Sequence, residues 1–202
     1  MNVVRDSHRY LLSFTSGSLF LQGASLAAVL YQETGDWTAV RAKLRADNLL
    51  QARTESTSNR WAFEVAYRLE MLNSDELSLV ADATGDELSQ LMWVAACRRY
   101  LFIGEFAEEV LRDRYLLLKT HLFPKHFDVF VSGKKLWHEE LSDIAESTLK
   151  KLRSNIFVML QEADLVTKQG VIVPTVIAAR VLDQIGSRAP SEVRFFPTSG
   201  ST

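Results

Sequence analysis

The stretch from residue 143 to residue 174 constrains the fold of this chain more than any other part of its sequence. It reads DIAESTLKKLRSNIFVMLQEADLVTKQGVIVP, and its pattern predicts a short helix, a tight turn, a second helix over residues 147–163 and then a small β-hairpin. Gly170 would supply the hairpin turn and residues 171–173 one of its strands. This order of elements is typical of a winged helix-turn-helix, a shape that commonly contacts nucleic acid.

The second helix of this unit has one apolar face and one basic face. Leu152, Ile156 and Met159 recur at helical spacing and predict a buried stripe. Lysine and arginine on the opposite face suit phosphate, and serine and asparagine suit base edges. The candidate contact residues are Lys150, Lys151, Arg153, Ser154 and Asn155 on the helix and Lys168 at the hairpin tip.

A basic helix face also has an ordinary explanation, because charged side chains usually lie on solvent-facing surfaces. The preceding segment, residues 139–146, is acidic and would either repel phosphate or pair with Lys150 and Arg153. Winged helices also serve as protein–protein modules. For this unit alone, nucleic-acid contact and these alternatives carry equal weight.

Residues 36–72 repeat the helix–turn–helix part of the pattern with more arginine. Asp36 is a good N-cap for a helix over residues 37–46, and a helix over residues 58–72 follows a polar turn. Hydroxyls, an amide and arginines at the start of that second helix would form a phosphate cradle. A plain capping cluster, or an ion-pair ladder along Arg60, Glu64 and Arg68, explains the same residues. The candidate contact residues are Arg41, Lys43, Arg45, Arg53, Ser56, Asn59 and Arg60.

The remaining pattern is also helical, so the sequence predicts an all-α fold with one small β-hairpin wing and two helix-turn-helix-like units. Helices are expected over residues 18–33, 75–83, 86–102 and 105–119, with Gly104 between the last two. Pro124 should begin a helix, residues 137–145 should form the first helix of the winged unit, and Pro174 should open a last helix. A linker at residues 121–125 divides the chain into predicted domains 1–119 and 124–202. The end, residues 187–202, is expected to be irregular, with Phe195-Phe196 docked on the body.

Composition and missing motifs exclude several classes of protein. The net charge of −2 excludes a strongly basic nucleic-acid-coating protein, so any binding must use local patches. Cys97 lies in an apolar run that predicts a buried thiol, and the four histidines lack the spacing of a zinc site. Neither a phosphate-binding glycine loop nor a catalytic motif occurs, which predicts a protein without catalytic activity, metal or cofactor. The chain has no signal-peptide core and no apolar run long enough to span a bilayer, so a cytoplasmic location is expected.

Several strings resemble one known family. They include SFTSG at residues 13–17, NLLQARTESTSNR at residues 48–60, EVAYRLEML, RYLFIGEFAEEVL and ESTLKKLRSNIFVMLQEADLV. Together they are similar to the BrxA family of bacterial BREX phage-defence systems over residues 10–173. The resemblance implies an all-helical, non-enzymatic DNA-binding protein that acts with other BREX components, among them a methyltransferase and ATPases. The family's likeness to NusB-type folds keeps RNA as a possible ligand.

Three functions therefore follow from the sequence. The first is binding of double-stranded DNA, mainly through phosphates, by the two basic surfaces. The second is a protein–protein adaptor within the BREX complex, which the acidic overall charge and the acidic segment 139–146 favour. The third is NusB-like binding of RNA.

Overall fold

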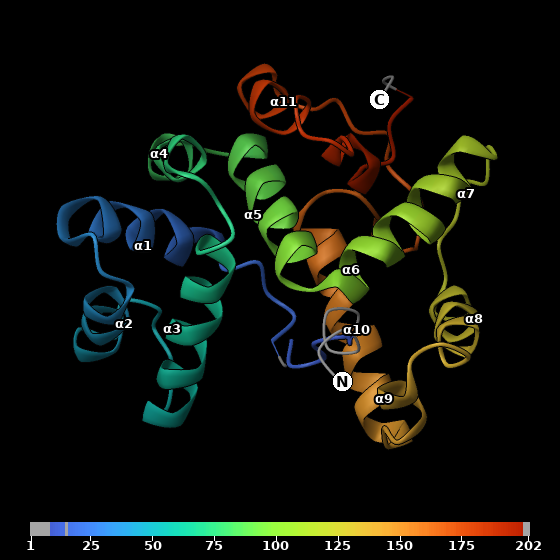
Figure 1. Ribbon diagram of the computed structural model, residues 1–202, viewed down its shortest axis with the longest axis horizontal. Helices are drawn as coiled ribbons and strands as arrows, with labels where there is room; N and C mark the ends of the chain where they lie inside the picture. Colours follow the sequence, from blue (N-terminus) through green and yellow to red (C-terminus); the bar gives the residue numbers. More distant parts are fainter. Residues whose placement is uncertain (1–8, 15, 200–202) are drawn as a thin grey trace, which may run out of the picture.

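The computed structural model describes residues 9–14 and 16–199, and helices make up most of this part of the chain (Figure 1). The helices are α1 (Leu21–Thr34), α2 (Trp37–Ala46), α3 (Glu55–Leu69), α4 (Ser74–Asp82), α5 (Asp86–Arg99), α6 (Leu101–Phe106), the π-helix η1 (Ala107–Arg112), α7 (Asp113–Leu116), α8 (Pro124–Lys134), α9 (Glu139–Ser142), α10 (Glu146–Glu162), α11 (Ala179–Ile185) and the 3-10 helix η2 (Glu192–Phe195). Helices α5 to α7 form a band across the middle, with α1 to α4 on one side and α8 and α9 on the other. The described residues form no sheet, so the mainly helical prediction is confirmed.

Several boundaries of the first four helices lie at the predicted capping residues, but α1 begins three residues later than expected and α3 spans Glu55–Leu69 instead of 58–72. Gly35 ends α1 in the left-handed conformation, with φ of 62°, which glycine adopts without steric cost. The side chain of Asp36 accepts hydrogen bonds from the amides of Thr38 and Ala39 and starts α2. Asn73 and Glu76 form a reciprocal capping box at the start of α4. Helix α1 packs against α4, and α2 packs against α3.

The central band departs from the predicted helices at the break between them and at its end, since α7 ends at Leu116 instead of residue 119. Instead of continuing to residue 102, α5 ends at Arg99, and Tyr100 is extended before α6 begins. Gly104 lies inside α6 and does not separate two helices, so that prediction was wrong. A Cβ at Gly104 would lie 3.1 Å from the carbonyl oxygen of Cys97. This glycine therefore serves the close packing of successive helices.

The predicted β-hairpin wing does not form. Val166 bridges Ile172 and His121 bridges Val171, each as an isolated antiparallel bridge. The backbone after Gly170 bonds both to residues 165–167 and to residues 120–122, and neither pairing extends beyond an isolated bridge. Gly170 does supply the predicted turn, with φ of 84°.

The helices around this turn are also shorter than predicted. The first helix of the predicted winged unit is only the single turn α9, whereas α10 matches its expected range within one residue. Pro174 does not open the last helix, which begins at Ala179. Residues 174–178 are irregular, and a side chain from another helix bonds to their backbone. Gln90 bonds the carbonyl of Val176 and the amide of Ala178, which fixes an extended course there.

A single hydrophobic core crosses both predicted domains. Trp93 of α5 is fully buried and donates a hydrogen bond to the carbonyl of Phe195, 2.9 Å away. The N-terminal segment also joins the two halves, because the carbonyl of Phe14 accepts a hydrogen bond from the Asn155 side chain of α10. The division into 1–119 and 124–202 stays a prediction, and its two parts share this core.

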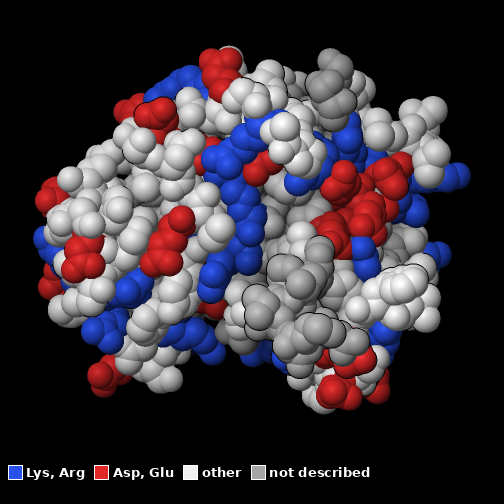
Figure 2. Space-filling model, in the orientation of Figure 1, with Lys and Arg blue, Asp and Glu red and all other residues white. Residues whose placement is uncertain are grey.

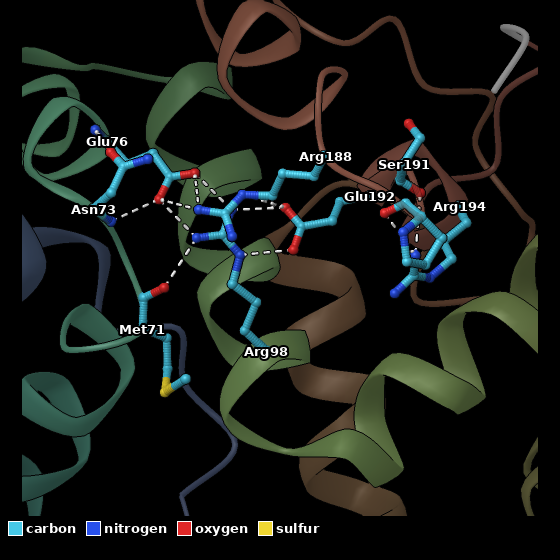
Figure 3. Close-up of polar contacts among 9 residues, drawn as sticks. Met71, Asn73, Glu76, Arg98, Arg188, Ser191, Glu192 and Arg194 are labelled. Atoms are coloured by element: carbon cyan, nitrogen blue, oxygen red, sulfur yellow. Dashed lines mark hydrogen bonds and ion pairs between the residues drawn. The ribbon is translucent and has the colours of Figure 1, made fainter.

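The C-terminal segment docks on the body, and a buried ion network holds it there (Figure 3). Arg98 of α5 donates hydrogen bonds to both carboxylate oxygens of Glu76 and both of Glu192, at 2.6 to 2.8 Å. Arg188 approaches the same two carboxylates from the tail. Burial alone would raise the pKa of Glu76, but the bonds from Arg98 and the Asn73 amide outweigh it and lower this pKa. Phe195 and Phe196 are buried, so the predicted docking of the tail is confirmed.

Candidate nucleic-acid interface

A pocket of about 540 Å³ lies where the C-terminal half of α2 meets the start of α3. We call it the α3 pocket. Its charged and amide groups come from both helices and from the loop between them. Arg45 donates a hydrogen bond to the Asn59 side chain across its rim, with an N–O distance of 3.1 Å. The lining residues are Ala42, Arg45, Ala46, Asn48, Ala52, Arg53, Thr54, Glu55, Ser58 and Asn59.

The loop that forms the pocket floor is fixed by side-chain bonds to its own backbone. Asn48 adopts the left-handed conformation, with φ of 44°, and its amide bonds both the N–H and the C=O of Ala52. Thr54 then caps α3 by accepting a hydrogen bond from the Thr57 amide. These bonds aim the chain so that Arg53 precedes the first turn of α3. The capping explanation is therefore correct for Thr54, and it leaves Arg53 free to act in the pocket.

Three features make the α3 pocket suited to an anion. The first amides of a helix have no intrahelical partner and carry partial positive charge, and those of α3 open at this pocket. The Oγ of Ser58 is buried and has no hydrogen-bond partner, although a buried hydroxyl normally has one. Arg45 and Arg53 add two positive charges, and Glu55 adds one negative charge. Guanidinium groups beside a helix N-terminus are donors that suit an oxyanion.

The other predicted residues of this unit lie around the pocket rather than in it. Lys43, Ser56 and Arg60 are exposed. Arg41 forms an ion pair with Glu70 at 2.9 Å. The ion-pair ladder along α3 exists only in its inner half, where buried Glu64 pairs with buried Arg68. No ion pair involves Arg60 in the described part of the chain.

Some candidate residues of α10 are exposed, and others already form ion pairs or hydrogen bonds within the protein. Lys150 pairs with Glu146 at 2.7 Å, as the acidic alternative predicts, and Arg153 pairs with Asp128 of α8 at 2.8 Å. Asn155 is turned inward toward Phe14, so its amide is used to hold the N-terminal segment. The candidates that stay exposed without such contacts are Lys151, Ser154 and Lys168. The α3 pocket is therefore the better-formed of the two predicted surfaces.

Sequence reasoning placed Ser58 only among the hydroxyls at the start of the second helix, and it did not single out Asn48. Ser58 lies among other serines and threonines, and residue type alone does not show which of them is buried. The position of Asn48 after a helix is a recognisable signal for a left-handed residue. No cluster of metal-ligating side chains occurs in residues 9–14 and 16–199, and the helices described there include none long and apolar enough to cross a membrane.

The fold and pocket define a class: a mainly helical protein with a surface pocket that is lined by arginines and lies at a helix N-terminus. Comparisons with known proteins identify the family. The chain belongs to the BrxA family, whose pattern matches residues 8–188. It is 24% identical over 165 residues to the BREX protein BrxA of Escherichia coli O9:H4 (strain HS), covering 82% of this chain and 78% of that protein.

Further relatives agree. The BREX protein BrxA of Paramagnetospirillum magneticum (strain ATCC 700264 / AMB-1) is 24% identical over 159 residues, which are 79% of this chain and 80% of that protein. A crystal structure of an uncharacterized protein from Magnetospirillum magneticum superposes with a TM-score of 0.80 at 21% identity. It covers 94% of this chain and 98% of the other. This likeness shows that the fold is shared. The resemblance noted from the sequence is confirmed, and the chain is a component of a BREX system.

Proposed function

We propose that this protein is a non-enzymatic, DNA-binding component of its BREX system, and that it contacts duplex DNA mainly through phosphates. The observation that carries the proposal is the α3 pocket. There, Arg45 and Arg53, the start of α3 and the unpartnered hydroxyl of Ser58 converge on one surface hollow. Phosphate is the anion that such a set of donors suits, and duplex DNA offers phosphates in regular array.

The charge distribution supports a local rather than a general attraction to nucleic acid. The whole chain carries a net charge of −2, so it would repel DNA without a cationic patch. Figure 2 shows Lys and Arg side chains gathered in a column on one face, with acidic side chains grouped to one side of it. Such segregation would orient the protein on a polyanion. The helix-turn-helix assignment of α2 with α3 and of α9 with α10 is part of the proposal.

Binding to a labelled duplex of random sequence tests the proposal. Fluorescence anisotropy should show that affinity falls as salt rises from about 50 to about 200 mM. If the protein neutralises about two phosphates, the fall should be about tenfold or more. The double variant Arg45→Ala/Arg53→Ala should bind more weakly and lose part of this salt dependence. Lys119→Ala/Lys135→Ala is the matched control, because it removes the same charge from exposed positions on the other side of the molecule.

The outcomes separate the alternatives. Equal weakening by both double variants would mean that only net charge matters, which contradicts a role for the pocket. Absence of duplex binding at low salt, with tight binding of a structured RNA, would favour the NusB-like alternative. Absence of binding to both nucleic acids would leave the adaptor role.

A specific observation favours the adaptor as the second candidate. Large apolar side chains are exposed near α7, α8 and α9, among them Trp137 at 85%, Leu136 at 78% and Leu118 at 88%. Exposed apolar patches mark interaction surfaces. Replacement of Leu136 and Trp137 by serine should abolish co-purification with another BREX component if this surface docks it, and should leave DNA affinity unchanged.

A further inference from the structure

A row of arginines and aromatic rings continues along α3 beyond the pocket. We call it the arginine–aromatic strip, and it consists of Arg41, Phe63, Tyr67 and Arg99. The guanidinium of Arg41 lies 5.3 Å from the ring centre of Phe63 and 5.9 Å from that of Tyr67. The guanidinium of Arg99 lies 4.8 Å from the ring of Tyr67, and the two rings are 5.7 Å apart. Three helices, α2, α3 and α5, therefore contribute to one strip.

The strip is accessible and only partly neutralised. Phe63 is 38% exposed. Arg41 is paired with Glu70, but no ion pair involves Arg99 in the described part of the chain, and its Nε is buried without a hydrogen-bond partner. Figure 2 shows basic side chains gathered on the drawn face where α3 and α5 lie in Figure 1. Positive charge beside an exposed ring suits a polyanion that also offers flat apolar groups.

The strip begins where the α3 pocket ends. Asn59 lines the pocket, and Phe63 follows it by one helical turn on the same face, about 6 Å along the axis. In a nucleotide one sugar separates the phosphate from the base, which is a distance of this order. A phosphate in the pocket would therefore place its base beside Phe63.

We propose that the arginine–aromatic strip binds an unpaired nucleotide segment, with a base stacked on Phe63 and a phosphate held in the α3 pocket. In a duplex both faces of a base are covered by its neighbours, so only an unpaired base can stack on a surface ring. The inference rests on the proposed phosphate-binding role of the pocket and adds a single strand as a ligand that the protein binds more tightly than a duplex. DNA and RNA strands share this chemistry.

The experiment measures the affinity of the full chain for a labelled single strand and for the duplex of the same sequence at equal salt. Wild-type protein should bind the single strand more tightly. Phe63→Leu keeps an apolar side chain but removes the ring, and it should weaken single-strand binding by about 5- to 100-fold, the usual effect of losing a base stack. Its duplex affinity should stay unchanged. Phe63→Tyr should retain wild-type behaviour, and Trp137→Leu, which removes an exposed ring elsewhere, should change neither affinity.

Each outcome has a distinct meaning. Equal or weaker wild-type affinity for both the DNA and the RNA single strand than for the duplex would overturn the inference while leaving duplex binding through Arg45 and Arg53 intact. An equal effect of Phe63→Leu on single-strand and duplex binding would do the same. Failure of the wild-type protein to bind either ligand would overturn the proposed function as well. An RNA strand of the same sequence identifies the source: tighter binding of the DNA or of the RNA strand than of the duplex supports the strip, and their ratio shows which one it prefers.

Discussion

Replacement of Arg98 by methionine should destabilise the protein more than any other single change of a charged residue in the ion network. The guanidinium makes four hydrogen bonds to Glu76 and Glu192 and a fifth, of 3.0 Å, to the carbonyl of Met71. The side chains of Arg98, Glu76 and Glu192 are 7%, 0% and 8% exposed. Methionine fills a similar volume, so the lost charge, rather than a cavity, would dominate the effect.

The magnitude follows from what is left behind. Removing one partner of a buried ion pair costs about 3–5 kcal/mol, because the other charge stays buried without compensation. Arg188 is 39% exposed and already reaches Glu76 at 3.3 Å and Glu192 at 3.6 Å, so it would offset part of this cost. We therefore expect a loss of about 3–4 kcal/mol in the free energy of unfolding, the lower half of that range. For a chain of this size the loss corresponds to a fall in Tm of about 6–16 °C.

Urea unfolding monitored by circular dichroism measures the change, and its pH dependence tests the cause. The pKa of Glu76 is lowered in the folded protein, so the network's contribution is fully present above the ordinary value of 4.5 and is lost as pH falls through the folded pKa. Wild-type protein should therefore lose more stability below about pH 4.5 than Arg98→Met does. The triple variant Arg98→Met/Glu76→Gln/Glu192→Gln removes all three charges and should be more stable than Arg98→Met alone. A loss below about 1 kcal/mol, or no recovery in the triple variant, would refute the reasoning.

Three further predictions concern the packing. Gly170→Ala should cost more than about 1 kcal/mol in urea unfolding, because φ is 84° and a Cβ would lie 2.7 Å from the carbonyl oxygen of Leu122. Gly133→Ala, in α8 with no neighbouring atom within 4 Å, is its control and should instead stabilise by about 0.5–1 kcal/mol. Phe196→Ala should cost about 3–5 kcal/mol by thermal unfolding, because the ring is fully buried; a change within error would mean that the tail does not contribute to the core. Burial raises the pKa of the Cys97 thiol well above its ordinary value, so a thiol reagent should label the protein only in denaturant, and rapid labelling of native protein would contradict this burial.

Local signals predicted much of the fold because their physical cause is local. Asp36 and Asn73 cap helices with their own side chains, and Gly35 ends a helix with its own backbone, so each acts within one turn. The apolar spacing along α10 was enough to predict its range and its buried face. Cys97 was predicted to be buried from its apolar neighbours, and it is.

The errors fall where distant residues compete for the same backbone. The predicted wing is reduced to isolated bridges, and the backbone after Gly170 bonds to residues 120–122 as well as to its own hairpin partner. The start of α11 moved to Ala179 because Gln90, far away in sequence, holds the backbone before it. Residues 120–122 and Gln90 lie far away in sequence, so the local sequence around each element does not reveal these contacts.

The same division applies to the candidate site. The sequence by itself determined that the start of α3 would carry arginines, an amide and capping hydroxyls, because these lie within one continuous segment. Only the tertiary structure decided which of them converge. Packing of α2 on α3 brings Arg45 to Asn59, burial isolates the hydroxyl of Ser58, and α5 places Arg99 beside Tyr67. The tertiary structure also turns Asn155 away from the predicted surface. Its side-chain amide donates a hydrogen bond to the backbone carbonyl of the buried residue Phe14, which needs a donor.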